Sequence, residues 1–210
     1  MSTVYPEGNI ESEKHIYCNS DCCICPPKHP KPSKILLECG CHPQDAIFEI
    51  RRGRVRRRQE YVLDKVVVDT SCLCRPQVKV EFSSIVYFEA EARGRYGRAK
   101  TESETEVEVE NFCGEQEVDV ALLFELVRVC DGVEEIVQSW NYEKDFQIRG
   151  TRSLQIEISE PFTVTYCDRE CPGCCSYKMK VSVRRTDGRF KALRVVCPNI
   201  SALAQGICGN

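Results

Sequence analysis

Long stretches of this sequence alternate apolar and polar residues one by one, and this pattern constrains the fold more than any other feature. In "VKVEFSSIVYFEAEA" (78–92) one face of an extended strand collects Val78, Val80, Phe82, Ser84, Val86, Phe88 and Ala90. The same alternation runs through 118–126, 154–166 and 177–183. Successive side chains of a strand point to opposite faces, so a period of two predicts half-buried antiparallel strands.

Shorter strand candidates fill most of the remaining chain after Ile35. They are 35–38, 46–50, 61–68, 105–112, 134–142, 190–196 and 199–204. No stretch repeats apolar residues at the spacing of a helix face, so little or no helix is expected. Turn signals such as "CDG" (130–132) and "TDG" (186–188) separate strands. We therefore predict an all-β fold, an antiparallel two-sheet sandwich or jelly roll.

The first 33 residues show neither the strand nor the helix period. Four prolines close this segment in "CPPKHPKPSK" (25–34). Proline fixes φ and resists both helix and central strand, so the segment is predicted to be extended. The expected organisation is an N-terminal arm, 1–33, followed by one β-sandwich domain, 34–210.

Composition and motifs exclude several functional classes. The net charge of −3 gives no reason to expect nucleic acid. The apolar runs are too short for a transmembrane helix, and residues 1–34 contain no apolar stretch of signal-peptide length. The sequence has no G-x-S-x-G, H-E-x-x-H or phosphate-binding loop motif. We therefore expect no enzymatic activity, no cofactor and no membrane insertion.

Cysteine is the unusual component, with 16 residues in a chain of 210. "HIYCNSDCCICPP" (15–27) alone holds four of them, on a polar segment where buried thiols are not expected. A lone Cys130 after an apolar strand, by contrast, fits a buried free thiol. Such density indicates either metal ligands or covalent cross-links, and the spacing favours cross-links.

A metal site is the alternative interpretation of the cysteines. Zinc sites commonly use two C-x-x-C turns, and only Cys171 and Cys174 in "CDRECPGCC" (167–175) have that spacing. Among the three histidines, His42 is the one that could complete such a set. The alternative ligands are therefore Cys171, Cys174 and His42.

Two charged segments stand out between the strands. "RRGRVRRR" (51–58) is interpreted as a charged hairpin tip or extended edge. "TESETEVEVE" (101–110) places its glutamates on one strand face, and one hypothesis pairs this face with the arginine strip. Trp140 and Tyr142 alternate with polar residues and are predicted to lie in the core.

Several phrases together resemble a known family. They are "KILLECG" (34–40), "VVVDTSCLCRPQVKVEFSSIV" (66–86), "LLFELVRVCDG" (122–132), "FTVTYCDRECPGCCSYKMKV" (162–181) and "ISALAQ" (200–205). In that order they resemble an uncharacterised family of spore-forming Firmicutes, catalogued as a domain of unknown function. The C-P-G-C-C-x-Y phrase is the most specific part. In architecture, a cysteine-bearing arm before a β-sandwich is similar to the endospore-appendage (Ena-type) pilus subunits, jelly rolls whose arms cross-link to other subunits.

The resemblance implies a structural subunit of a self-assembling, disulfide-cross-linked extracellular fibre or spore-surface appendage. Such subunits polymerise with copies of themselves through strand or arm exchange, in a mother cell that later lyses. Alternatives are a cytosolic zinc-binding interaction module and a jelly roll that binds a carbohydrate or a surface.

On this interpretation each group of cysteines has an expected role, although the sequence does not determine the pairings. Inter-subunit links are expected from Cys18, Cys22, Cys23, Cys25, Cys167, Cys171, Cys174, Cys175 and Cys208. Bridges within the domain are expected from Cys39, Cys41, Cys72 and Cys74.

Overall fold

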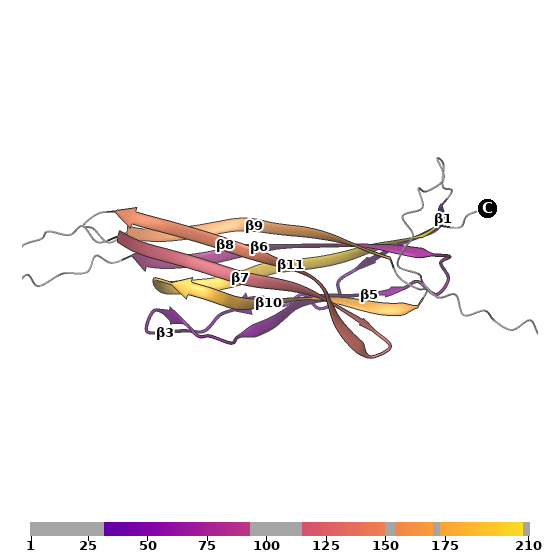
Figure 1. Cartoon of the computed structure of the whole chain (residues 1–210), viewed down its shortest axis with the longest axis horizontal. Coiled ribbons are helices and arrows are strands. Elements are labelled where there is room, and N and C mark those ends of the chain that lie inside the picture. The colour runs from indigo at the N-terminus through magenta and orange to yellow at the C-terminus, as the bar shows by residue number, and fades with distance from the viewer. Residues whose placement is uncertain (1–31, 93–114, 150–153, 170–172, 208–210) are drawn as a thin grey trace, which may run out of the picture.

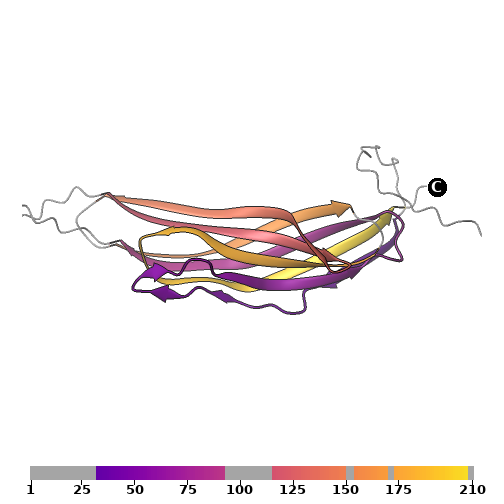
Figure 2. The ribbon, with the colours of Figure 1, turned by 60° about the horizontal axis from the view of Figure 1, so that its bottom comes forward.

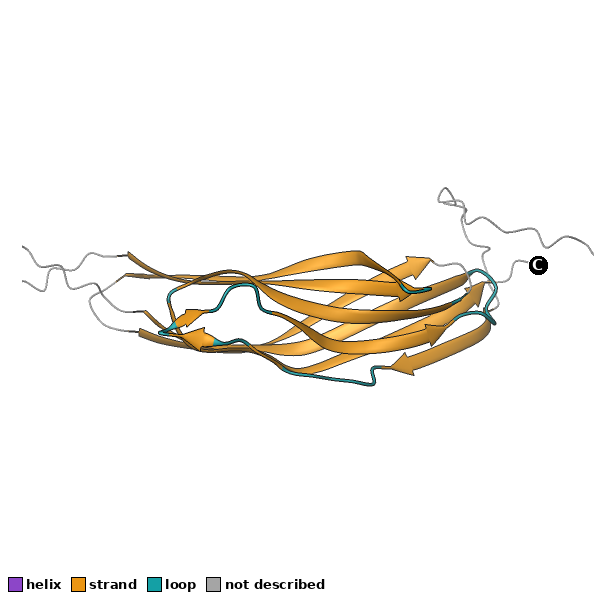
Figure 3. Cartoon of the chain, turned by 90° about the horizontal axis from the view of Figure 1, so that it is seen from below, coloured by secondary structure: helices purple, strands orange, loops and turns teal. Residues whose placement is uncertain are grey.

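The computed structural model describes residues 32–92, 115–149, 154–169 and 173–207. Figure 3 shows strands and connecting loops in these ranges, with no helix among them. The strands run along the long axis of an elongated molecule (Figure 1). The all-β prediction is confirmed. The candidate strand 105–112 lies outside the described residues. The predicted arm, 1–33, also lies outside them except for its last two residues, which begin the first strand.

Two antiparallel sheets face each other (Figure 2). The first sheet has the order β1–β11–β6–β9, with β2 also paired to β11, and comprises β1 (Pro32–Cys39), β11 (Arg189–Ile207), β6 (Pro76–Ala92), β9 (Leu154–Arg169) and β2 (Ala46–Ile47). The second has the order β5–β10–β7–β8, and comprises β5 (Glu60–Asp69), β10 (Cys174–Asp187), β7 (Glu115–Cys130) and β8 (Val133–Arg149). A separate hairpin pairs β3 (Ile50–Arg51) with β4 (Arg54–Val55).

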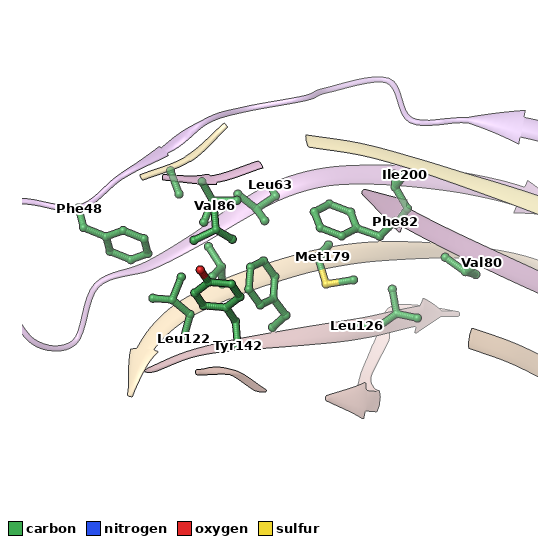
Figure 4. Packing of buried hydrophobic residues seen from close by; sticks show 14 of the residues in the cluster. Phe48, Leu63, Val80, Phe82, Val86, Leu122, Leu126, Tyr142, Met179 and Ile200 are labelled. Atoms are coloured by element: carbon green, nitrogen blue, oxygen red, sulfur yellow. The ribbon is translucent and has the colours of Figure 1, made fainter. Parts of the chain in front are cut away.

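The core lies between the two sheets and is built from the faces that the alternation predicts. Every inward position predicted on β6, from Val78 to Ala90, is buried, and so are the predicted inward residues of β7 from Val118 to Leu126. Figure 4 shows part of this cluster, with Phe82 and Val86 of β6 on one side and Leu122 of β7 on the other. The ring of Phe124 on β7 stacks on Phe162 of β9 with centroids 4.0 Å apart. Burying each such side chain stabilises the fold by roughly 1.5–3 kcal/mol.

Two hairpin turns share the same backbone geometry, with glycine at the second central position of each. Asp131 and Gly132, which join β7 to β8, have φ values of 51° and 79°. Arg52 and Gly53, between β3 and β4, have nearly the same values, 52° and 79°. Positive φ at both central residues is the signature of the tight hairpin turn that matches strand twist. The "CDG" turn and the interpretation of the arginine strip as a hairpin are both confirmed.

Two segments differ from the prediction. The candidate 46–50 is divided between β2 and β3, which belong to different sheets. The candidates 190–196 and 199–204 form a single strand, β11, with a register irregularity between Val196 and Asn199. Pro198 cannot donate a ladder hydrogen bond, which suggested a break at this point. The chain instead forms a bulge in which Cys197 takes a positive φ of 53°, so the strand continues past the proline.

Candidate functional site: exposed thiols at one end of the sandwich

Most of the described cysteines lie at one end of the sandwich, which we call the cysteine end. It consists of the β5–β6 loop (70–75), the turn after β7, the last residues of β9 and the first residues of β10. Cys72 and Cys74 are exposed in the loop, and Cys174 pairs in register with Asp69 at the end of β5. Pro32, the first residue of β1, pairs with Ile207 at this same end, beside the C label in Figure 1. Residues before Pro32 therefore join the sandwich at the cysteine end.

A disulfide joins Cys130 of β7 to Cys175 of β10 at the cysteine end. The two residues lie directly opposite each other in the ladder, with a Cα–Cα distance of 4.5 Å. That separation is typical of a non-hydrogen-bonded pair, whose side chains lie close together. Two predictions are therefore wrong: Cys130 is not a free thiol, and Cys175 is not available for another subunit.

An ion pair between the buried Asp168 and the partly buried Arg128 connects the two sheets beside this disulfide. Asp168 of β9 is 7% exposed, and its Oδ2 accepts hydrogen bonds from Nη1 of Arg128 (2.9 Å) and from the Tyr177 hydroxyl (3.2 Å). Arg128 also donates through Nη2 to Glu135 of β8 at 2.7 Å. The acceptor and its donors belong to strands of different sheets, so this network fixes how the sheets lie relative to each other at the cysteine end.

The loop connections at the cysteine end are also fixed. The Thr70 backbone N–H donates to the Gly173 carbonyl at 2.7 Å, and the Gly173 N–H donates to Thr70 Oγ1 at 3.1 Å. Thr70 is buried. The exposed side chains of Cys72, Cys74 and Cys174 therefore project from a well-anchored surface.

A second group of thiols lies on the segment 39–42, which follows β1. The buried carboxylate of Asp64 on β5 accepts hydrogen bonds from the backbone N–H groups of His42 (3.1 Å), Lys65 (2.8 Å) and Ile200 (3.2 Å). A Cβ added to Gly40 would lie 2.1 Å from Asp64 Oδ2, so only glycine fits there. Asp64 thus fixes the backbone from which Cys39 and Cys41 reach solvent. No sequence motif indicated this role.

Cys39 and Cys41 are exposed and carry free thiols, so the bridges predicted for them within the domain are wrong. The register gives the reason for Cys39, because Ser201 and not a cysteine lies opposite it in the ladder. For Cys72 and Cys74 the predicted bridges stay a prediction.

The structure places two of the predicted inter-subunit cysteines on the surface. Cys167 and Cys174 are exposed with free thiols at or near the cysteine end. The other candidates still open, Cys18, Cys22, Cys23, Cys25, Cys171 and Cys208, lie outside the described residues. Cys197 is a further exposed thiol, on the β11 bulge, where its N–H donates to Asp45 Oδ1 at 2.9 Å. The sequence analysis assigned Cys197 no role. The proline that follows it within an apolar segment was the one sequence feature that indicated an irregular, exposed position.

The alternative metal ligands do not come together. The His42 backbone is bonded to Asp64, whereas Cys174 pairs with Asp69, the residue five positions further along β5. At about 3.3 Å per residue, this places them roughly 16 Å apart along the strand. Cys171 lies outside the described residues. Within the described ranges no three His, Cys, Asp or Glu side chains are grouped as metal ligands would be.

The arginine strip lies at the opposite end of the sandwich, which we call the arginine end. There the β3–β4 hairpin docks on β11, where the Phe190 N–H donates to the Gly53 carbonyl at 2.8 Å. Hydrogen bonds from Arg56 and Arg51 hold the pKa of Glu49 below its usual value. The proposed partner segment, 101–110, lies outside the described residues.

The aromatic residues predicted for the core are placed as expected. Tyr142 is buried and Trp140 is partly buried against the core. Burial, together with the nearby Glu160 carboxylate, raises the pKa of the Tyr142 hydroxyl. These rings are therefore not arranged as an exposed binding platform.

Comparison with known proteins gives a family but no activity. No curated protein matches the chain significantly. No helix in the described part of the chain is long and apolar enough to cross a membrane. A family described as "Domain of unknown function (DUF4489)" matches residues 33–205, which include the sandwich from the start of β1 almost to the end of β11. The chain belongs to this family of uncharacterised domains.

Proposed function

We propose that this chain is a structural subunit of a self-assembling, disulfide-cross-linked extracellular fibre, of the pilus or spore-appendage type. The observation that carries the proposal is the position of the exposed thiols. Cys167 and Cys174 are exposed and unbonded near the end of an elongated sandwich. The cysteine-bearing arm joins the sandwich at that end, through Pro32.

The arm is long enough to reach a neighbouring copy. Pro32 lies seven positions after Cys25 and fourteen positions after Cys18. Extended chain spans at most about 3.5 Å per residue, so these cysteines reach roughly 25 to 50 Å from the sandwich. The longest strand, β11, has 19 residues and is therefore about 63 Å long. In a copy that abuts end to end through its arginine-bearing end, these thiols would lie about 63 Å away, beyond this reach. The arm therefore reaches the exposed thiols of a second copy that overlaps the first along part of its length.

Strand β8 offers a second means of association, by addition of a strand from a neighbour. In the described part of the chain β8 pairs only with β7, and its 17 residues contain no proline. The other long edges are protected: β9 carries Pro161, and β5 is covered by the N–H groups of Cys41 and Gln44. An uncovered edge of this length invites pairing with another chain.

The proposed site of assembly follows from the chemistry. Disulfides persist in oxidising surroundings such as the cell exterior or a spore surface. The family resemblance to proteins of spore-forming Firmicutes supports assembly in a mother cell that later lyses. Immunogold labelling of intact spores and of mother-cell sections is the direct test of this placement.

Gel electrophoresis with and without reductant, combined with negative-stain microscopy, tests the fibre function. Oxidised protein should form a ladder of covalent multimers that reductant collapses to a 24.0 kDa band, together with fibres. Replacing Cys18, Cys22, Cys23 and Cys25 by serine should abolish the ladder. The matched control, Cys197→Ser, removes one exposed thiol at mid-strand and should leave the ladder intact. A stable monomer with bound zinc and no fibres would contradict the proposal.

A further inference from the structure

Cys41 differs from the other exposed thiols in its surroundings. Its Sγ lies 2.9 Å from Nδ1 of His42, the next residue. The same sulfur lies 3.5 Å from the backbone carbonyl oxygen of Lys65, so the ring nitrogen is the nearer of two acceptors for the single thiol proton. Cys39, two residues earlier on the same segment, is also exposed and free, and contacts no ring nitrogen among the described residues. The chain therefore holds two neighbouring thiols, one with a base and one without.

The backbone keeps this pair together. The Cys41 N–H donates to the Lys65 carbonyl at 3.1 Å, and the His42 N–H donates to Asp64 Oδ1 at 3.1 Å. Gln44 adds a third bond to β5, from its N–H to the Leu63 carbonyl at 2.7 Å. Both members of the pair thus rest on a segment fixed to β5, so their contact does not depend on a flexible loop.

A thiol beside an imidazole has a defined chemistry. The attacking species in disulfide exchange is the thiolate, and a neighbouring histidine favours it by accepting the thiol proton. The resulting imidazolium then donates a charge-assisted hydrogen bond to the sulfur. The exposed position gives a disulfide access to the sulfur, which a buried thiol would not.

We propose that Cys41 and His42 form a thiol–imidazole pair that makes Cys41 the exchange-active thiol of this domain, with disulfides as its substrates. His42 Nδ1 accepts the Cys41 proton, and the thiolate attacks one sulfur of the disulfide. A bond forms between Cys41 Sγ and that sulfur, while the original sulfur–sulfur bond breaks. The leaving thiolate takes up the proton from His42. The step exchanges one disulfide for another and needs no external oxidant.

This inference goes beyond fibre assembly and stands independently of it. The reaction is a property of the reduced monomer, because both residues belong to one chain. Fibres can form through other thiols when Cys41 is unreactive, and Cys41 can react with a disulfide when no fibre forms. A test on reduced monomer therefore separates the two proposals.

The test is site-resolved labelling of the fully reduced full-length chain with 4,4′-dithiodipyridine below one equivalent. Aliquots are quenched in acid over time and mapped by peptide mass spectrometry. Cys41 should gain the thiopyridyl group about tenfold faster than Cys39, the control on the same segment. Equal rates at the two thiols in the unaltered chain would overturn the proposal, whatever any variant does.

The variant His42→Asn then assigns the effect to the ring. Asparagine keeps the backbone N–H that binds Asp64 but is not a base. Its Cys41 rate should fall to that of Cys39, while the Cys39 and Cys197 rates stay the same. Constant rates at those two thiols show that the fold is retained. An unchanged Cys41 rate in this variant would refute the role of His42.

Discussion

The two ends of the sandwich are built from different interactions. At the cysteine end a disulfide and the Thr70–Gly173 hydrogen bonds tie strands of one sheet together, and the Arg128–Asp168 ion pair links that sheet to the other. At the arginine end the charged side chains of the β3–β4 hairpin face solvent, and Arg51 and Arg56 share Glu49 as partner. No described cysteine lies there. Near the arginine end the buried Asp119 of β7 pairs with Arg185 of β10, a strand of the same sheet. The comparison shows that the disulfide and the ion pair between the sheets lie where the arm joins the sandwich.

This difference matters for assembly because the ends are not interchangeable. Contacts between unlike surfaces on successive copies extend head to tail and produce filaments when they do not close into a ring. An elongated sandwich with thiols at one end and arginines at the other has the asymmetry that such contacts require. The contrast between the ends can be tested by removing each kind of interaction in turn.

Removing the disulfide should have the largest effect on the stability of the isolated domain. The bond closes a sequence separation of 45 residues, so the double variant Cys130→Ala with Cys175→Ala should lose about 3–4 kcal/mol of unfolding free energy. Urea unfolding under oxidising conditions measures this. In reductant the two proteins should differ little. A difference of the same size in reductant would mean that packing, and not the covalent bond, stabilises this end.

A matched pair of arginine substitutions compares the two ends directly. Arg128→Met leaves the buried Asp168 carboxylate without its cation and should cost about 3 kcal/mol. Arg56→Met removes a partner of Glu49 from a solvated pair and should leave the urea midpoint unchanged. Equal losses for the two variants would contradict the claim that the buried Asp168 carboxylate depends on its cation more than the solvated Glu49 does.

Acid should weaken an ion pair that lies between the two ends of the sandwich. In this pair Lys144 of β8 lies 2.9 Å from Glu160 of β9. Burial raises the pKa of Glu160, but the Lys144 ammonium and the neighbouring Tyr142 hydroxyl outweigh it, and the net pKa lies below the usual 4.5. A carboxyl whose pKa is lowered by folding stabilises the folded state above its unfolded pKa. That contribution is lost as the pH falls through the folded value.

The expected effect of pH is small and specific. The thermal midpoint should fall as the pH drops below about 4.5. The midpoint of the Lys144→Met variant should fall less steeply over the same range, because this variant lacks the ion pair. Melting curves of both proteins between about pH 3 and pH 6 measure this slope. Parallel curves would show that the acid sensitivity arises from other carboxylates.

The sequence predicted the layers of the fold well because burial alternates with period two along single strands. The inward faces of β6 and β7 were predicted residue by residue. Strand register was not predictable, since it depends on partners far apart in the chain. For this reason the Cys130–Cys175 bond was missed and Cys175 was assigned to another subunit. The continuity of β11 was missed because a bulge at Cys197 accommodates the proline.

The thiol segment was only half predictable. "CGCH" (39–42) marked Cys41 and His42 as chemically interesting, but as a bridge and a metal ligand. Their contact depends on the backbone that Asp64 fixes. In the sequence, nothing distinguishes Asp64 from other polar residues within apolar strands. A buried carboxylate that binds three backbone N–H groups becomes visible only when β5, β11 and the segment 39–42 are placed side by side.

The most direct test of the central claim is whether disulfides join different copies of the chain. Equal amounts of reduced 14N-labelled and 15N-labelled protein are mixed, oxidised, digested without reductant and analysed by mass spectrometry. The account predicts linked peptides from the arm cysteines in which half of the pairs carry one label of each kind. The Cys130–Cys175 pair should carry a single label throughout, as an internal control. Arm cysteines found only in single-label pairs, or unpaired, would contradict the account.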